Sequence, residues 1–266
     1  MNKMAVQAAR RVVSHISTLK QVRPALQEFL LHERISAPIQ GFCVTDFPLW
    51  KLAYLLDETW IEEDIMNALA ELAYFIHAIS LQNMTPTCLY LPTKFLSDAR
   101  LLYHQDPRIY SPELATLWHR LISTRVDFIG FLHCKDSHYS AFTLDRSQPL
   151  LLHSDSLGYR APGDVLPILQ WVLSGMNYPF PTYVHEMVVP RQAASGAGSG
   201  SCGMAAHDFV LSHFTPGSGV SDPSSYRWTS SESPCLRDDA LSDLVNFHHI
   251  ASDNVIVCFL FQCRDL

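Results

Sequence analysis

A cysteine lies where a glycine-rich stretch meets the start of a helix-like run. Residues 192–203 read Q-A-A-S-G-A-G-S-G-S-C-G, between a strand-like run over 182–189 and a helix-like run over 204–213. A helix N-terminus carries about half a positive charge and several unpaired backbone N–H groups. Both features favour a thiolate, and the same N–H groups can stabilise an oxyanion. Cys202 is therefore a candidate nucleophile.

Two upstream residues are suited to serve such a thiolate. His138 begins a strand-like run, and Asp155 follows the next one, 17 residues later. Neighbouring antiparallel strands can bring these positions together, so that the imidazole takes the thiol proton and the carboxylate holds one tautomer. Taken singly, each has a plainer interpretation: a surface histidine, a turn aspartate that bonds local N–H groups, and an inert buried cysteine. The ordered set favours catalysis.

Composition excludes several classes of protein. The chain has 266 residues, of which 48% are hydrophobic and 17% charged, which is typical of a globular protein of one or two domains. Its net charge of −7 argues against a nucleic-acid partner. No apolar stretch is long enough to cross a membrane, and the first residues lack a secretory pattern. We expect an intracellular protein, nuclear or cytoplasmic, with no membrane partner.

The cysteines give no sign of a metal site. Seven are scattered along the chain without a C-x-x-C pair, so neither a zinc site nor a redox dithiol is expected, and no cofactor is predicted. Cys88, Cys134 and Cys258 lie in apolar strand-like runs. We expect them to be small buried hydrophobic residues in a reducing compartment.

Hydrophobic periodicity predicts an α+β fold, with a central, mostly antiparallel sheet flanked by helices. Helices are predicted over 1–34 (broken near Pro24), 62–80, 111–123, 164–174 (with Asp164 as its N-cap), 202–214 and 238–250. Strands are predicted over 88–95, 126–134, 138–144, 150–153, 182–189 and 255–261, and a long loop over 216–234. We assign 1–40 to an N-terminal helical extension and 41–266 to the main domain.

The ordered residues resemble the Ulp/SENP-type cysteine proteases of the CE clan, also called adenain-like. That family shows a histidine followed by Trp or Tyr, then Asp-Ser-Leu, then a glutamine before Cys-Gly. The matching residues here are His138-Tyr139, Asp155-Ser156-Leu157, Gln192 and Cys202-Gly203. An upstream W-L-x-D signature is similar to Trp60-Ile61-Glu62-Glu63, with Glu63 at the position of the aspartate.

The resemblance implies a papain-like, adenain-like protease fold that cleaves after the C-terminal diglycine of SUMO, ubiquitin or a related modifier. Cys202 would be the nucleophile, His138 the general base, Asp155 its orienting group and Gln192 an oxyanion donor. The substrate-binding residues would be Trp60, Tyr139, Glu63 and Gly203. The aromatic pair would form a tunnel that admits only glycine, because any Cβ would meet the rings.

Two departures from the family pattern concern the nucleophile loop. Gln192 stands ten residues before Cys202, further than is usual in the family, and Ser201 replaces the common aspartate. Whether Gln192 reaches the oxyanion site is open, and we expect the loop to order on substrate binding.

Other interpretations remain. Gly198, Gly200 and Gly203 match G-x-G-x-x-G, which would place a pyrophosphate at the helix N-terminus. No βαβ repeat follows to support a nucleotide site. A YopJ-type acetyltransferase shares the clan fold, and a non-catalytic module could bind a ubiquitin-like protein without cleaving it. The modifier itself is not specified by the sequence.

Overall fold

The computed structural model describes residues 36–43, 45–80, 88–105, 115, 117–119, 126–174, 176, 178–196, 198–214 and 226–253. The chain divides into two compact units that alternate along the sequence. The first unit combines Met1–Leu72, Gln192–Met204 and Thr229–Leu266, and the second combines Ala73–Arg191 and Ala205–Trp228.

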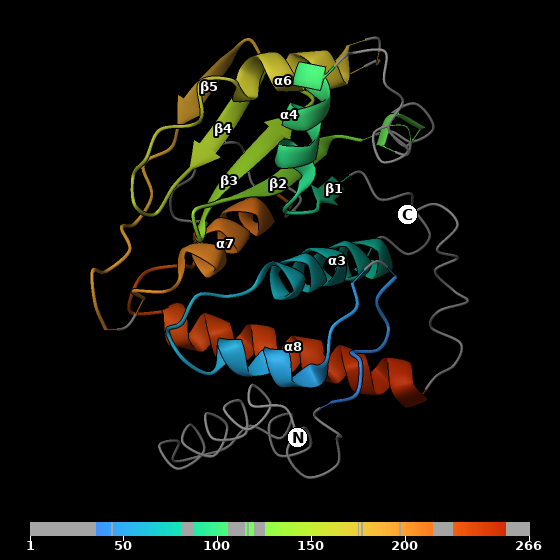
Figure 1. Cartoon of the computed structure of the whole chain (residues 1–266), viewed down its shortest axis with the longest axis vertical. Helices are drawn as coiled ribbons and strands as arrows, with labels where there is room; N and C mark the ends of the chain where they lie inside the picture. The colour runs from blue at the N-terminus through green and yellow to red at the C-terminus, as the bar shows by residue number, and fades with distance from the viewer. Residues whose placement is uncertain are drawn as a thin grey trace. The chain divides into compact units, whose positions relative to one another are not determined.

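The second unit contains a five-stranded sheet in the order β1-β2-β3-β4-β5 (Figure 1). The strands are β1 (Cys88–Leu91), β2 (Phe128–Lys135), β3 (His138–Asp145), β4 (Leu150–Ser154) and β5 (Tyr183–Glu186). The central strands β2, β3 and β4 pair antiparallel, whereas β1 and β5 join the two edges in parallel. The predicted α+β fold with a mostly antiparallel centre is confirmed.

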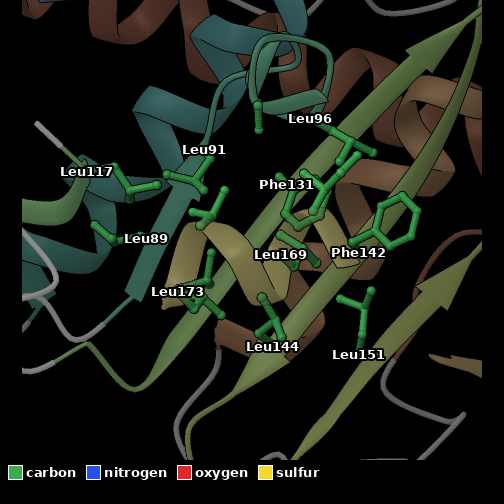
Figure 2. Close-up of a cluster of buried hydrophobic side chains, with 14 of the residues drawn as sticks. Leu89, Leu91, Leu96, Leu117, Phe131, Phe142, Leu144, Leu151, Leu169 and Leu173 are labelled. Carbon is green, nitrogen blue, oxygen red and sulfur yellow. The ribbon is translucent and has the colours of Figure 1, made fainter. Parts of the chain in front are cut away.

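One face of the sheet is covered by α4 (Phe95–Gln105) and α6 (Val165–Leu173). Alternate strand residues such as Phe131, Phe142 and Leu151 point to this face, because side chains alternate along a strand. Figure 2 shows them packed against leucines of both helices. This cluster is the main hydrophobic core of the second unit.

Helix α7 (Cys202–Phe214) packs on the other face of the sheet through its body. A Cβ at Gly130 of β2 would lie 2.4 Å from Val210 Cγ1, so the missing side chain permits a close approach. The Tyr90 hydroxyl of β1 contacts His207 Nδ1 at 3.0 Å. The helix begins and ends where the sequence predicts.

The first unit is built on η1 (Leu49–Leu55), the start of α3 (Glu63–Ser80) and α8 (Ser233–Asp253). Its core includes Leu49, Leu52 and Leu55 of η1 and Leu241 and Leu244 of α8, all nearly inaccessible to solvent. Helices η1 and α8 lie side by side (Figure 1).

Several predicted boundaries need correction. The strand predicted over 88–95 ends at Leu91, since Pro92 has no N–H for a ladder, and Phe95 already begins α4, which the sequence analysis missed. The strand predicted over 182–189 is shorter, Tyr183–Glu186, and the helix predicted over 238–250 is longer, Ser233–Asp253.

Two side chains also differ from expectation. The apolar spacing over 62–80 predicts one buried stripe on this helix. Ile65, Leu69 and Leu72 of α3 are buried as that stripe requires, but Ile76 is 54% exposed and Phe75 is buried instead. Asp164 occupies the N-cap position of α6 without a side-chain cap hydrogen bond. Its carboxylate accepts two hydrogen bonds from Arg100, at 2.6 and 2.9 Å.

Other predictions fall on residues that the structure does not describe. These are the helix over 1–34, the strand over 255–261 and most of the segments 111–123 and 216–234. The division into 1–40 and 41–266 stays a prediction. Among described cysteines, Cys88 is a buried thiol, Cys134 is a partly buried thiol, and Cys43 is disulfide-bonded. No described helix is long and apolar enough to cross a membrane.

Candidate active site

His138 and Asp155 form a hydrogen-bonded pair in the second unit. His138 begins β3 and Asp155 directly follows β4, and these adjacent strands pair antiparallel with Ala141 opposite Ser154. The register therefore brings both residues to the same end of these two strands. His138 Nε2 lies 2.8 Å from Asp155 Oδ2, and the side chains are only 15% and 4% exposed.

The other carboxylate oxygen of Asp155 is held by the turn that follows. Its Oδ1 accepts hydrogen bonds from the N–H groups of Leu157 and Gly158, both at 2.8 Å, and of Tyr159 at 3.3 Å. Burial raises the pKa of Asp155, but the His138 hydrogen bond and charge, with the backbone N–H groups, outweigh it and lower the pKa. The carboxylate is therefore ionised and fixed toward the ring, so the turn role and the histidine contact coexist.

Cys202 is the first residue of α7 and belongs to the first unit, whereas the His138–Asp155 pair belongs to the second. It is a free cysteine and only 4% exposed. Gly203, the next residue of the helix, is also buried. The thiol thus lies at the N-terminal turn of a helix, whose first N–H groups have no partner within the helix. That position favours an anion.

Gln192 bonds within its own loop. Its side-chain amide donates a hydrogen bond to the carbonyl of Ser199, in the glycine-rich turn. The neighbouring Ala193 N–H donates to Ser230 Oγ at 3.1 Å. Hydrogen bonds therefore tie the loop to the rest of the first unit, and the role of Gln192 as an oxyanion donor stays a prediction.

A polar cluster that no sequence pattern indicates surrounds the turn that precedes Cys202. We call Glu58, Ser201, Ser233 and Arg237 the Glu58 cluster; all four belong to the first unit. Glu58 Oε2 accepts hydrogen bonds from Ser201 Oγ at 2.7 Å and from Ser233 Oγ at 3.3 Å. No spacing rule connects residues this far apart in sequence, so only the fold reveals them.

Arg237 holds two backbone segments together from α8. Its guanidinium donates to the carbonyls of Tyr54 (2.9 Å), Asp57 (2.6 Å), Thr59 (2.8 Å) and Gly200 (2.9 Å). Burial lowers the pKa of Arg237, while the charges of Glu58, Asp57 and Cys202 oppose that shift. A buried cation therefore lies within electrostatic reach of the candidate thiol and fixes the carbonyl two residues before it.

Of the predicted substrate-binding residues, Trp60 and Glu63 belong to the first unit and Tyr139 to the second. Trp60 is half-buried in the first unit, and Glu63 is the first residue of α3. Tyr139 has no exposed surface, as expected of a core aromatic, and its role in a substrate tunnel stays a prediction.

The carboxylates flanking Glu63 have a partner within the first unit. Glu62 lies 2.7 Å from Lys51 Nζ, and Asp64 also contacts this ammonium group. Burial lowers the pKa of Lys51, but both carboxylates outweigh it, so the pKa is raised.

Close backbone contacts account for the glycines at positions 198 and 200, so no nucleotide site is needed to explain them. A Cβ at Gly200 would lie 1.7 Å from the carbonyl oxygen of Glu58, and one at Gly198, where φ is +81°, would lie 2.6 Å from Ser230 Cα. Both glycines therefore serve contact between backbones. Among the described residues, no cluster of three His, Cys, Asp or Glu side chains suits a metal ion.

Comparison with solved structures identifies the fold. A Chaetomium thermophilum Ulp1-like SUMO protease catalytic domain aligns with a TM-score of 0.58 and 15% identity, over 92% of this chain and 90% of that chain. The C-terminal Ulp1 protease domain, solved in complex with Smt3, the yeast SUMO ortholog, gives 0.55 and 12%, over 92% and 96%.

A de-sumoylating protease aligns with a TM-score of 0.62 and 10% identity, over 86% of this chain and 98% of that chain. No family model and no curated protein matches the chain. The resemblance read from the sequence is thus confirmed at the level of the fold, which is that of Ulp1-type cysteine proteases.

Proposed function

We propose that this chain is a cysteine protease that cleaves a peptide or isopeptide bond after the C-terminal glycine of a ubiquitin-like protein. The observation that carries the proposal is the buried 2.8 Å hydrogen bond between His138 and Asp155, in a fold shared with SUMO proteases. A neutral imidazole oriented by an ionised carboxylate is the general base that a cysteine nucleophile requires.

In the proposed reaction the Cys202 thiolate attacks the carbonyl carbon of the terminal glycine. His138 takes the thiol proton through Nδ1, because Nε2 is directed to Asp155, and then donates it to the leaving amine. Water hydrolyses the resulting thioester with the same histidine as base. The N–H groups of the α7 N-terminus and the Gln192 amide stabilise the oxyanion, each contributing about 3 kcal/mol.

SUMO is the favoured substrate, with ubiquitin second. Solved proteases of this fold act on SUMO, and one was solved in complex with a SUMO ortholog. Trp60 would flank the diglycine tail, with Glu63 and Gly203 beside it, and Tyr139, which has no exposed surface, would join it only after becoming exposed. Selection then follows from size, because a residue larger than glycine cannot enter a narrow aromatic channel.

The test uses SUMO and ubiquitin probes that carry a C-terminal electrophile. We expect a covalent adduct at Cys202 with SUMO, lost in Cys202→Ser and retained in Cys235→Ser, a matched control because Cys235 is an exposed free thiol. Intact-protein and peptide mass spectrometry identify the modified residue.

Each other outcome rejects the proposal in its own way. Tight binding of SUMO without an adduct would indicate a binding module. Transfer of an acetyl group from acetyl-CoA, without hydrolysis of any probe, would indicate an acetyltransferase. An adduct that persists in Cys202→Ser would remove Cys202 from the mechanism.

A further inference from the structure

Ser201, the residue before the candidate nucleophile, is held by a carboxylate from a distant part of the sequence. Glu58 Oε2 accepts the Ser201 hydroxyl hydrogen bond at 2.7 Å, and Ser201 also contacts the Ser233 hydroxyl. Ser201 and Ser233 have no exposed surface, and the Glu58 side chain is 23% exposed. Two buried hydroxyl groups therefore converge on one carboxylate oxygen.

The same carboxylate faces the buried guanidinium of Arg237. Glu58 Oε2 lies 3.6 Å from Arg237 Nε, while the other guanidinium nitrogens bind four backbone carbonyls, including that of Gly200. A buried cation without a compensating charge is unfavourable. Glu58 thus serves two functions: it anchors Ser201 and it balances the charge that fixes Gly200.

We propose that Glu58 is the positioning residue of the nucleophile turn, 198–202. Its carboxylate holds Ser201, and with Arg237 it fixes the backbone that presents Cys202. The inference rests on the proposed function in taking Cys202 as the nucleophile. It deepens that function by assigning a role to a residue outside the His, Asp, Gln and Cys set.

The sequence supports this role through a replacement. Ser201 stands where the proteases that the chain resembles commonly carry an aspartate. In this chain the residue before the cysteine has no charge, and the cluster supplies a carboxylate from Glu58 instead. An aspartate placed at 201 should therefore substitute for Glu58, because its oxygens would lie where the Ser201 hydroxyl now meets Glu58.

The experiment compares Glu58→Gln with the double variant Glu58→Gln/Ser201→Asp. Glu232→Gln is the matched control, because Glu232 is exposed, immediately precedes α8 and loses the same charge. The first readout is the rate of Cys202 alkylation by iodoacetamide between pH 5 and 9, quantified by peptide mass spectrometry. The second is kcat and KM on a SUMO-derived substrate.

Glu58→Gln should raise the alkylation rate at pH 6 about tenfold and move the profile to lower pH, because the uncompensated guanidinium favours the thiolate. Its kcat should fall about 10²-fold with KM nearly unchanged, as a displaced nucleophile requires. Ser201→Asp in that background should return both readouts to within about fivefold of the wild type. The Glu232→Gln control should change neither.

Equal alkylation profiles for Glu58→Gln and the wild type, including equal lack of reaction, would overturn the proposal. So would failure of Ser201→Asp to restore either readout, because a general loss of folding is not repaired by one aspartate. If the wild type cleaves no ubiquitin-like substrate, the proposed function fails, while the alkylation profiles still decide the role of Glu58.

Discussion

The His138–Asp155 pair and the nucleophile turn (198–202) are held in place in opposite ways. The pair needs one hairpin register and one turn: the two residues end adjacent strands, and the carboxylate is held by N–H groups within four positions of it. The nucleophile turn is held by Glu58 and Arg237, which lie far from it in sequence. The acid–base pair is encoded locally, and the nucleophile turn is encoded by tertiary contacts.

This difference predicts different responses to substitution. Changes at the pair should affect chemistry more than folding, because the local backbone keeps its hydrogen bonds. Changes in the Glu58 cluster should affect folding and chemistry together, since the same buried groups hold both backbone segments.

Asp155→Asn should have the largest effect on turnover. The amide oxygen can still accept the turn N–H groups, but the amide nitrogen would face His138 Nε2 and impose the wrong tautomer. We expect kcat to fall about 10³- to 10⁴-fold, measured by hydrolysis of a SUMO-derived substrate. Asp145→Asn, at the far end of β3, is the control and should retain activity.

Asp155→Asn should also change how the stability of the fold depends on pH in acid. The pKa of Asp155 is lowered in the folded chain, so its stabilisation is present above the unfolded value of about 3.9 and is lost as pH falls below it. Asp155→Asn should therefore show a weaker acid loss of stability below about pH 4. A variant with wild-type turnover would contradict the local assignment of the pair.

Arg237→Met should destabilise the first unit strongly. It removes the donor to four backbone carbonyls and leaves Glu58 beside two buried hydroxyls. We expect the free energy of unfolding to fall by about 3–5 kcal/mol, measured by urea denaturation. Lys51→Met, which removes a more exposed ion pair, should cost less than about 1 kcal/mol. Equal losses of unfolding free energy in the two variants would show that Arg237 stabilises the first unit no more than the more exposed ion pair of Lys51 does.

Gly200→Ala should perturb the turn through the backbone. The added Cβ would lie 1.7 Å from the carbonyl oxygen of Glu58, so one segment must move. We expect a loss of about 1–3 kcal/mol and reduced turnover. Gly163→Ala is the matched control, since nothing lies within 4 Å of its Cβ. A Gly200→Ala protein as stable and active as the control would contradict the tight contact.

His133→Leu should have the smallest effect, and it should stabilise the second unit. His133 is buried on β2, and neither ring nitrogen has a hydrogen-bond partner among the described residues. An apolar side chain of similar size should raise the free energy of unfolding by about 1 kcal/mol at pH 7. Urea denaturation measures this gain.

The gain should grow in acid. Burial, with the charge of Arg100, lowers the pKa of His133 to about 4. Because the unfolded histidine titrates near 6.5, acidification from pH 7 to 5 favours the unfolded chain by about 2 kcal/mol through this residue. His133→Leu should remove that share of the pH dependence. An unchanged pH dependence would show that His133 is not the responsible group.

Prediction from sequence succeeded where a signal is periodic and short in range. Helix α7, strands β2 to β4 and most of α3 follow from apolar spacing, and their bounds differ by few residues from those predicted. Helix α4 was missed because only Leu96 and Ala99 are fully buried among its eleven residues, which is a weak stripe. The sequence predicts that Asp164 caps α6, but its carboxylate accepts hydrogen bonds from Arg100 and makes no side-chain cap hydrogen bond.

The order of the chemistry-bearing residues, the α+β class and the strand ends that bring His138 to Asp155 all follow from local sequence patterns. These depend on side-chain alternation and hairpin register, which act over short stretches of chain. Tertiary structure alone decided that Glu58 and Arg237 would hold the turn before Cys202, and that Tyr139 would be fully buried. Burial and charge compensation between distant segments depend on how the chain packs, and no local pattern encodes them.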